Sequence, residues 1–378
     1  MKRAFFILAV CLLLVLAVSF SIKPAIIFLA QQQFKKVFIG SAVSIGNCSL
    51  RPLEELTLTD IEIKKGKIYN FQINTIKFQY NPLAIIKGEI QKICLKNAKI
   101  ILNLPESNIL ESAQYFNLKS KRRFSLAALE LAELELNLKT KELNLNTKIS
   151  GRINLRNKLI ENFDCRTGSL EGWGWQLDNA VFQADQATGG LLFIDKIKYN
   201  KLKVEKISSQ VRLKDNFLYL DSLSAGFLGG KIQAEASFKI DESVQYALNL
   251  KLIEIDLSRL VEDFNVQEKV NLKGRLTGAV SLEGIASRVT RLGGDLSAVG
   301  TGGTLTIKDT EFLEKVARNS RQPLEVLVES FKNYQYNTGV VKLFLENDNL
   351  ILDIALEGEA GKRNLTVTLH NFKLGGWQ

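Results

Sequence analysis

The chain has 378 residues, of which 46% are hydrophobic and 24% are charged, with only 5 Pro and a single Met. This composition excludes a disordered protein, because a chain this apolar can bury enough surface to fold. The net charge of +10 could attract nucleic acid or anionic lipid, but Lys and Arg are dispersed along the chain, which argues against a nucleic-acid partner.

An uncharged run of 19 residues extends from Ala4 to Ile22, between Arg3 and Lys23. As a helix it would be about 28 Å long, close to the roughly 30 Å hydrocarbon core of a bilayer. The sequence therefore predicts a transmembrane anchor. Its apolar side chains include Phe5, Phe6, Leu12, Leu13, Leu14, Leu16 and Phe20.

The charges around this run indicate its orientation. Lys2, Arg3 and the α-amino group precede the run and Lys23 alone follows it, so we expect a cytoplasmic N-terminus and a periplasmic main body. A cleaved signal peptide is the alternative, because Ala17-Val18-Ser19 resembles a small-residue cleavage site. The length of the apolar run favours the retained anchor.

Past the anchor, hydrophobic and polar residues alternate with a period of two. A typical run places Leu134, Leu136 and Leu138 between polar neighbours, and the longest extends from Val270 to Gly284. Because successive side chains of a strand point to opposite faces, this pattern predicts strands with one buried and one wet face. Such sheets are usually antiparallel, and turn signals such as Gly229-Gly230 predict consecutive hairpins.

Few segments depart from this alternation. We expect one helix from Glu311 to Arg318, capped by Asp309-Thr310, and another from Leu324 to Asn333, started by Pro323. A turn at residues 81–86, a helix near residues 105–115 and a glycine-rich turn at residues 300–304 complete the predicted exceptions.

Residues with catalytic or metal-binding chemistry are scarce. His370 is the only His, and Cys48, Cys94 and Cys165 show neither metal-ligand spacing nor an even count for a disulfide framework. One incidental bridge stays open as an alternative in an oxidising compartment. We therefore expect no enzyme, no catalytic residue, no metal and no cofactor.

Several segments together resemble AsmA-like proteins. The anchor followed by VSIGNCSLRPLEELTLTDIEI and INTIKFQYNPLAIIKGEIQKICLKNAKIIL resembles the N-terminal region of that family over residues 1–104. LSAGFLGGKIQAEASFKI, VNLKGRLTGAVSLEG and LGGDLSAVGTGGTLTI are similar to its C-terminal regions, and the tail from Leu324 to Phe372 looks closer to the YdbH branch. Residues from Pro105 to about Phe193 match the family poorly.

The resemblance implies a fold class: mainly β, with an N-terminal transmembrane helix and an elongated, twisted antiparallel β-sheet curled into an open groove under a few short covering helices. Candidate groove-lining residues are the apolar members of the alternating runs. They are Leu136, Leu138, Ile153, Ile232, Phe238, Tyr246, Leu248, Leu250, Leu272, Leu276, Val280, Leu352, Ile354 and Leu356.

We divide the chain into five expected segments. Residues 1–30 would form the cytoplasmic tip and anchor, 31–104 an AsmA-like N-terminal β region, 105–308 the elongated groove, 309–336 a helical cap and 337–378 C-terminal β-hairpins.

By resemblance, the protein would be anchored in the bacterial inner membrane and carry phospholipid or another acyl lipid between the inner and outer membranes. An outer-membrane or periplasmic protein is a further candidate partner. The alternative is an envelope scaffold or outer-membrane assembly factor, in which the sheet folds on itself around a closed core.

Overall fold

The structure is a computed structural model. It describes residues 22–51, 53–81, 83–84, 88–104, 125–157, 159–172, 174–185, 189–214, 216–239, 243–286, 288–320, 323–370 and 372. The chain divides into two units, Met1–Thr188 (unit 1) and Gly189–Gln378 (unit 2).

The predicted anchor lies outside the described residues, apart from Ile22. This residue belongs to a helix that the structure describes over residues 22–37, here named the N-terminal helix. Among the helices that are described, none is both long enough and apolar enough to cross a bilayer. The predicted helix near residues 105–115 also falls outside the described part.

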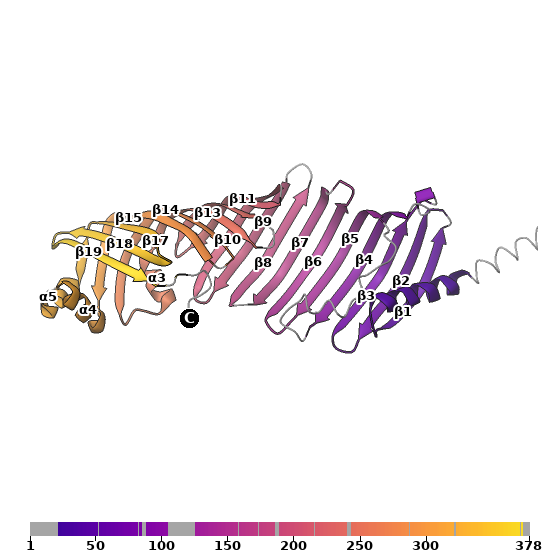
Figure 1. The fold of residues 1–378 in the computed structure, drawn as a ribbon, viewed down its shortest axis with the longest axis horizontal. Coiled ribbons are helices and arrows are strands. Elements are labelled where there is room, and N and C mark those ends of the chain that lie inside the picture. The colour runs from indigo at the N-terminus through magenta and orange to yellow at the C-terminus, as the bar shows by residue number, and fades with distance from the viewer. Residues whose placement is uncertain are drawn as a thin grey trace, which may run out of the picture. The chain divides into compact units, whose positions relative to one another are not determined.

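Strands make up most of unit 1 (Figure 1). They are β1 (Ala42–Arg51), β2 (Glu55–Lys65), β3 (Tyr69–Gln79), β4 (Glu89–Asn103), β5 (Ser125–Lys139), β6 (Leu143–Asn154), β7 (Leu159–Gly172) and β8 (Trp175–Asp185). Each strand pairs with the next in chain order. All pairs but one are antiparallel, as expected for one-sided sheets.

The exception is the pair of β4 and β5, which is parallel, with Ile93 opposite Leu129 and Leu102 opposite Leu138. The expectation of a purely antiparallel meander is therefore wrong at this point. A parallel pair needs a crossover connection that returns the chain to the same end of the sheet, and more than 20 residues separate the two strands here.

Unit 2 continues with hairpin-linked strands. They are β9 (Gly189–Tyr199), β10 (Leu202–Lys214), β11 (Phe217–Phe227), β12 (Gly230–Lys239), β13 (Gln245–Asp256), β14 (Val270–Ile285), β15 (Arg288–Ile307), β16 (Tyr334–Tyr336), β17 (Thr338–Glu346), β18 (Asn349–Gly358) and β19 (Gly361–Leu369). Pairing is antiparallel throughout, and β15 pairs with both β16 and β17.

The pairing registers place the predicted apolar residues of unit 2 on a single face. One rung, for example, joins Ile232, Leu252, Gly278, Leu296, Val341, Ile354 and Leu365. Gly278 lies on this face and permits a close backbone approach, because an added Cβ there would meet the carbonyl oxygen of Asp295. The period-two interpretation is confirmed.

Residues with left-handed backbone interrupt the alternation of unit 1 along a line. Asp60, Asn97 and Glu133 have φ values of 55°, 49° and 61° and lie at one level of β2, β4 and β5. At this level the pairs from β2 to β5 skip one residue on both strands and keep their register, whereas the register of β5 and β6 shifts between Leu131 and Leu134. Apolar side chains on both sides of the line keep to one face, as the buried Leu58 and Ile61 show.

The helices of unit 2 connect strands. As predicted, α4 (Thr310–Ser320) and α5 (Leu324–Phe331) follow Asp309 and Pro323, and Figure 1 shows them together at one end of the unit. A third helix, α3 (Leu257–Phe264), was not predicted. The glycine-rich turn expected at residues 300–304 is wrong: β15 runs through it as an irregular stretch, because Gly300 and Gly302 adopt positive φ values where β15 changes partners.

Two sealed cores lie at separate places. In unit 1 the N-terminal helix covers the apolar face of β1 to β4, where Cys48, Ile63 and Tyr69 are buried. In unit 2, α4 and α5 cover the ends of β15, β16 and β18, burying Leu313, Phe331 and Tyr336.

We predict that Leu313→Ala destabilises the chain by about 2–5 kcal/mol, because Leu313 is only 1% exposed and its loss leaves a cavity under α4. Val326→Ala on α5 is the matched control, since Val326 is 53% exposed. Urea denaturation followed by tryptophan fluorescence measures both. A Leu313→Ala cost no larger than that of Val326→Ala would show that the helices do not close a core.

Candidate functional site

A cavity of about 650 Å³ lies on the apolar face of the sheet in unit 2. This volume is within the range of small-molecule binding sites. The wall is formed by β13 to β15, by β17 to β19 and by α3; its residues include Leu252, Leu272, Leu276, Leu296, Leu305, Val341, Leu343, Leu352, Ile354, Leu356, Leu365 and Val367.

Strong curvature of the sheet creates this cavity. Leu252 on β13 and Val367 on β19 line the same space, although five steps of the strand ladder separate their strands. At roughly 4.8 Å per step a flat sheet would hold them about 24 Å apart. The strands must therefore curl around the cavity, with the apolar face on the concave side.

The concave face is covered only in part. Leu272, Leu276, Leu352 and Ile354 are half-buried rather than buried. In the described part of the chain no pairing joins β9 to β19, so the strands of unit 2 do not close on themselves. The predicted open groove thus agrees with the sheet of this unit.

One end of the groove is closed and largely apolar. The Tyr336 hydroxyl donates a hydrogen bond to the carbonyl oxygen of Lys273 at 2.9 Å, and burial raises the pKa of this phenol. Tyr336 is therefore neutral at physiological pH and satisfied within the wall.

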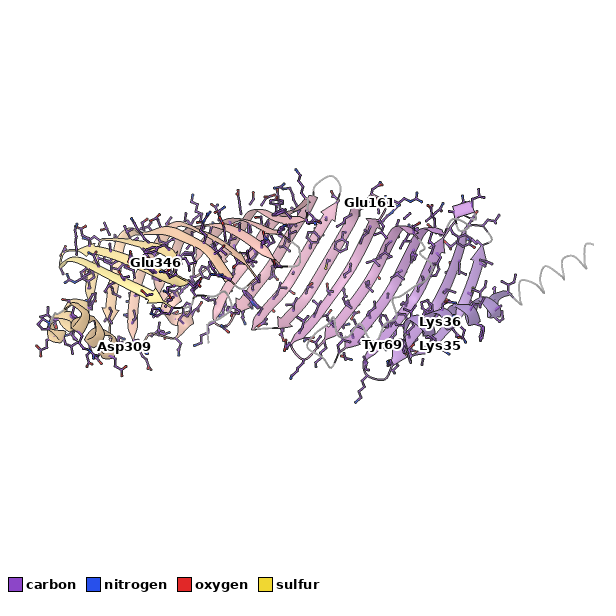
Figure 2. All side chains as sticks on the ribbon, in the orientation of Figure 1. Lys35, Lys36, Tyr69, Glu161, Asp309 and Glu346 are labelled. Atoms are coloured by element: carbon purple, nitrogen blue, oxygen red, sulfur yellow. The ribbon has the colours of Figure 1, made fainter. Side chains whose placement is uncertain are left out.

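The charged residues among those lining the cavity are Lys269 and Asp309. Their side chains are 3.8 Å apart, with Lys269 mostly exposed, so the charges belong to the rim. Figure 2 labels Asp309 near α4. The interior can accommodate an apolar ligand without burying an unpaired charge.

Five of the predicted lining residues meet at this cavity: Leu272, Leu276, Leu352, Ile354 and Leu356. Ile232, Phe238, Tyr246, Leu248, Leu250 and Val280 lie on the same sheet face along β12 to β14, beside the cavity lining but outside it. Their role in lining a groove stays a prediction.

Leu136, Leu138 and Ile153 belong to unit 1, where they share the apolar face of β5 and β6. Leu136 and Ile153 are half-buried and Leu138 is buried. The face here is continuous from Leu102 on β4 to Leu138 on β5. The anchor residues from Phe5 to Phe20 lie outside the described residues.

Sequence reasoning missed the contribution of α3. Leu257 and Leu260 face the cavity, and Phe227 and Leu228 at the end of β11 lie beside them. The signal was present: Asp256 accepts a hydrogen bond from the Ser258 backbone at 2.9 Å as a helix cap, and Leu257, Leu260, Val261 and Phe264 have helical spacing.

Outside the apolar cavity, we find no cluster of metal-binding or nucleophilic side chains among the described residues. The described His, Cys, Asp and Glu residues form no group able to hold a metal ion. Cys48, Cys94 and Cys165 are free thiols, and burial raises the pKa of the first two, which makes them poor nucleophiles. His370 is exposed beside Asn349.

Comparison with protein families gives one match. The model of the AsmA family matches residues 175–301, which extend from β8 into β15 and include half of the cavity wall. The match begins at residue 175, inside the stretch from Pro105 to about Phe193 whose sequence resembles the family poorly. The resemblance of residues 1–104 and of the YdbH-like tail stays a prediction. No curated protein and no solved structure matches the chain significantly.

We predict that Leu248→Lys leaves a cooperatively folded protein, because the half-buried Leu248 can turn a charged end group into solvent. Leu58→Lys is the contrasting variant: Leu58 on β2 is only 2% exposed in the core under the N-terminal helix, so an unpaired ammonium there should cost several kcal/mol. Circular dichroism and urea denaturation distinguish the two. Equal loss of structure in both variants would mean that the apolar face is a sealed core along its whole length.

Proposed function

From the premise that this chain is an AsmA-like protein, we propose that it binds phospholipid acyl chains along the apolar concave face of its sheet and conducts them between the inner and outer membranes. The family match and the open sheet support an envelope or lipid-transport role in general. Acyl-chain conduction is the more specific step that we propose.

The observation that carries the proposal is the uncovered apolar face of unit 2. A sheet that buries its apolar side chains for stability alone would be expected to cover them, as α4 and α5 do at one end. Along β13 to β19 these side chains instead line an open cavity whose charged residues stay at the rim. Large accessible apolar surfaces usually mark a binding site.

Continuity of the apolar face suits transport better than tight binding. A lipid that leaves a bilayer loses about 0.8 kcal/mol for every methylene group that enters water. A break that exposed four methylenes would cost about 3 kcal/mol, which slows passage roughly a hundredfold. A one-sided groove avoids that cost while its open side leaves the polar headgroup in water.

The remaining assignments follow from this proposal. The protein would be an inner-membrane protein with one anchor, a cytoplasmic N-terminus and a periplasmic β region. Its partners would be phospholipid or another acyl lipid, the inner membrane, and a periplasmic or outer-membrane protein at the receiving side. The proposal assigns no catalytic residue, metal or cofactor.

A second candidate function is an envelope scaffold or assembly factor. The sealed core of unit 1 favours it, because the N-terminal helix closes the face of β1 to β4 and leaves no room there for a ligand. A scaffold needs only stable sheet and exposed edges. Lipid transfer distinguishes the two functions.

We predict that Val341→Asp lowers phospholipid transfer at least about tenfold, because it places a carboxylate on the cavity wall, in the path of the acyl chains. Val340→Asp is the matched control: the neighbouring Val340 is 42% exposed and points to the opposite face of β17. The assay follows a fluorescent phospholipid moving from donor vesicles, which carry the full chain, to acceptor vesicles.

Equal transfer by the two variants and the unmodified chain would contradict conduction along this face and favour the scaffold. Circular dichroism of each variant establishes that the sheet remains folded.

A further inference from the structure

The N-terminal helix exposes a surface that the packing of unit 1 does not use. Its inner side chains, among them Ile26, Ile27, Ala30 and Phe34, pack on the apolar face of β1 to β4. Phe38, just beyond the helix, completes this contact with ring centroids 5.1 Å from Phe71 and 6.1 Å from Tyr69. The helix is therefore held firmly to the sheet, and its orientation on the sheet is fixed.

Away from the sheet, this helix exposes large apolar side chains among Gln32, Lys35 and Lys36. Phe28 and Leu29 are each 59% exposed, although a helix buried on one face normally carries polar residues on the other. Ile22, Val37 and Ile39 are exposed as well. We name the exposed residues Ile22, Phe28, Leu29, Val37 and Ile39 the outer stripe.

Only positive charges accompany the outer stripe. Lys23, Lys35 and Lys36 are exposed on the same segment, and Figure 2 shows Lys35 and Lys36 near Tyr69 at the edge of unit 1. The sequence contains no acidic residue before Glu54. An amphipathic helix with exposed aromatic and aliphatic side chains and a purely basic charge has the composition of a segment that lies in the interface of an anionic membrane.

We propose that the outer stripe is a membrane-surface seat, in which its apolar side chains enter the boundary between headgroups and acyl chains while Lys23, Lys35 and Lys36 contact anionic lipid phosphates. The position in the chain supports a bilayer as the occupant, because the uncharged run from Ala4 to Ile22 leads directly into the described part of this helix. Since the helix packs on β1 to β4, the seat also holds the first strands of unit 1 against the leaflet.

This inference goes beyond the proposed function, because a flexible tether would suffice for an anchored lipid carrier. A seated helix fixes the direction in which the sheet leaves the membrane. It also means that no aqueous gap separates the sealed core of unit 1 from the leaflet surface.

The test uses the full chain in lipid nanodiscs, with single cysteines introduced by Phe28→Cys or Leu29→Cys. Leu53→Cys is the matched control: Leu53 is an exposed apolar residue of unit 1, in the turn between β1 and β2 and away from the helix. A water-soluble maleimide reports accessibility in a chain whose native Cys11 and Cys165 are replaced by Ser, while the native thiols Cys48 and Cys94 are buried. Discs of phosphatidylcholine alone are compared with discs that also contain phosphatidylglycerol.

We expect Phe28→Cys and Leu29→Cys to be labelled about tenfold more slowly than Leu53→Cys in the anionic discs, and less protected in the neutral discs. Leu53→Cys should remain reactive in both.

Equal labelling of Phe28→Cys and Leu53→Cys in anionic discs would overturn the seat. A Phe28→Cys disulfide-linked dimer would also overturn it, because it would show that a second copy covers the stripe. Neither result depends on the cavity of unit 2, so the seat and the lipid-binding proposal can fail separately.

Discussion

The structure depends on one constraint: apolar side chains must stay on one face of the sheet while the strands bend. A residue with left-handed backbone inside a strand would turn every later side chain to the wrong face if the sequence kept a strict alternation. The chain avoids this by spacing apolar residues three apart around Asp60, Asn97 and Glu133, as in Leu58 and Ile61, Leu95 and Ala98, and Leu131 and Leu134. Curvature and a continuous apolar face are therefore compatible.

The units cover that face differently. In unit 1 the N-terminal helix seals the first strands, and in unit 2 the pair α4 and α5 seals one end. Between the sealed end and the open side of unit 2, the face lines a cavity with a neutral interior and charged rim. We interpret the sealed parts as the source of stability and the open part as the source of function, since packing energy is available only where the face is dry.

Much of this arrangement could be predicted from the alternation alone. Runs such as Val270 to Gly284 specify a strand and its buried face, because no helix sorts residues in this way. The signal was weaker for α3, because its eight residues follow an alternating strand without a break. The parallel direction of β4 and β5 could not be predicted either, since it depends on a long connection rather than on a local pattern.

The cavity itself could not be predicted. Leu252 and Val367 have no feature in the sequence that brings them together; the sum of twist and bulges over five pairings does so. The sequence thus predicts which residues lie on the apolar face. Only the curvature of the sheet determines that Leu272, Leu352 and Ile354 line the cavity while Leu248 and Phe238 do not.

Photocrosslinking in living bacteria tests the central claim most directly. A benzophenone amino acid at Leu343, on the cavity wall, and at its neighbour Lys342, on the outer face of β17, samples the two sides of one strand. Our account predicts phospholipid adducts at Leu343 and not at Lys342 when purified chains are analysed by mass spectrometry. Adducts that are absent at Leu343, or equally abundant at both positions, would contradict it.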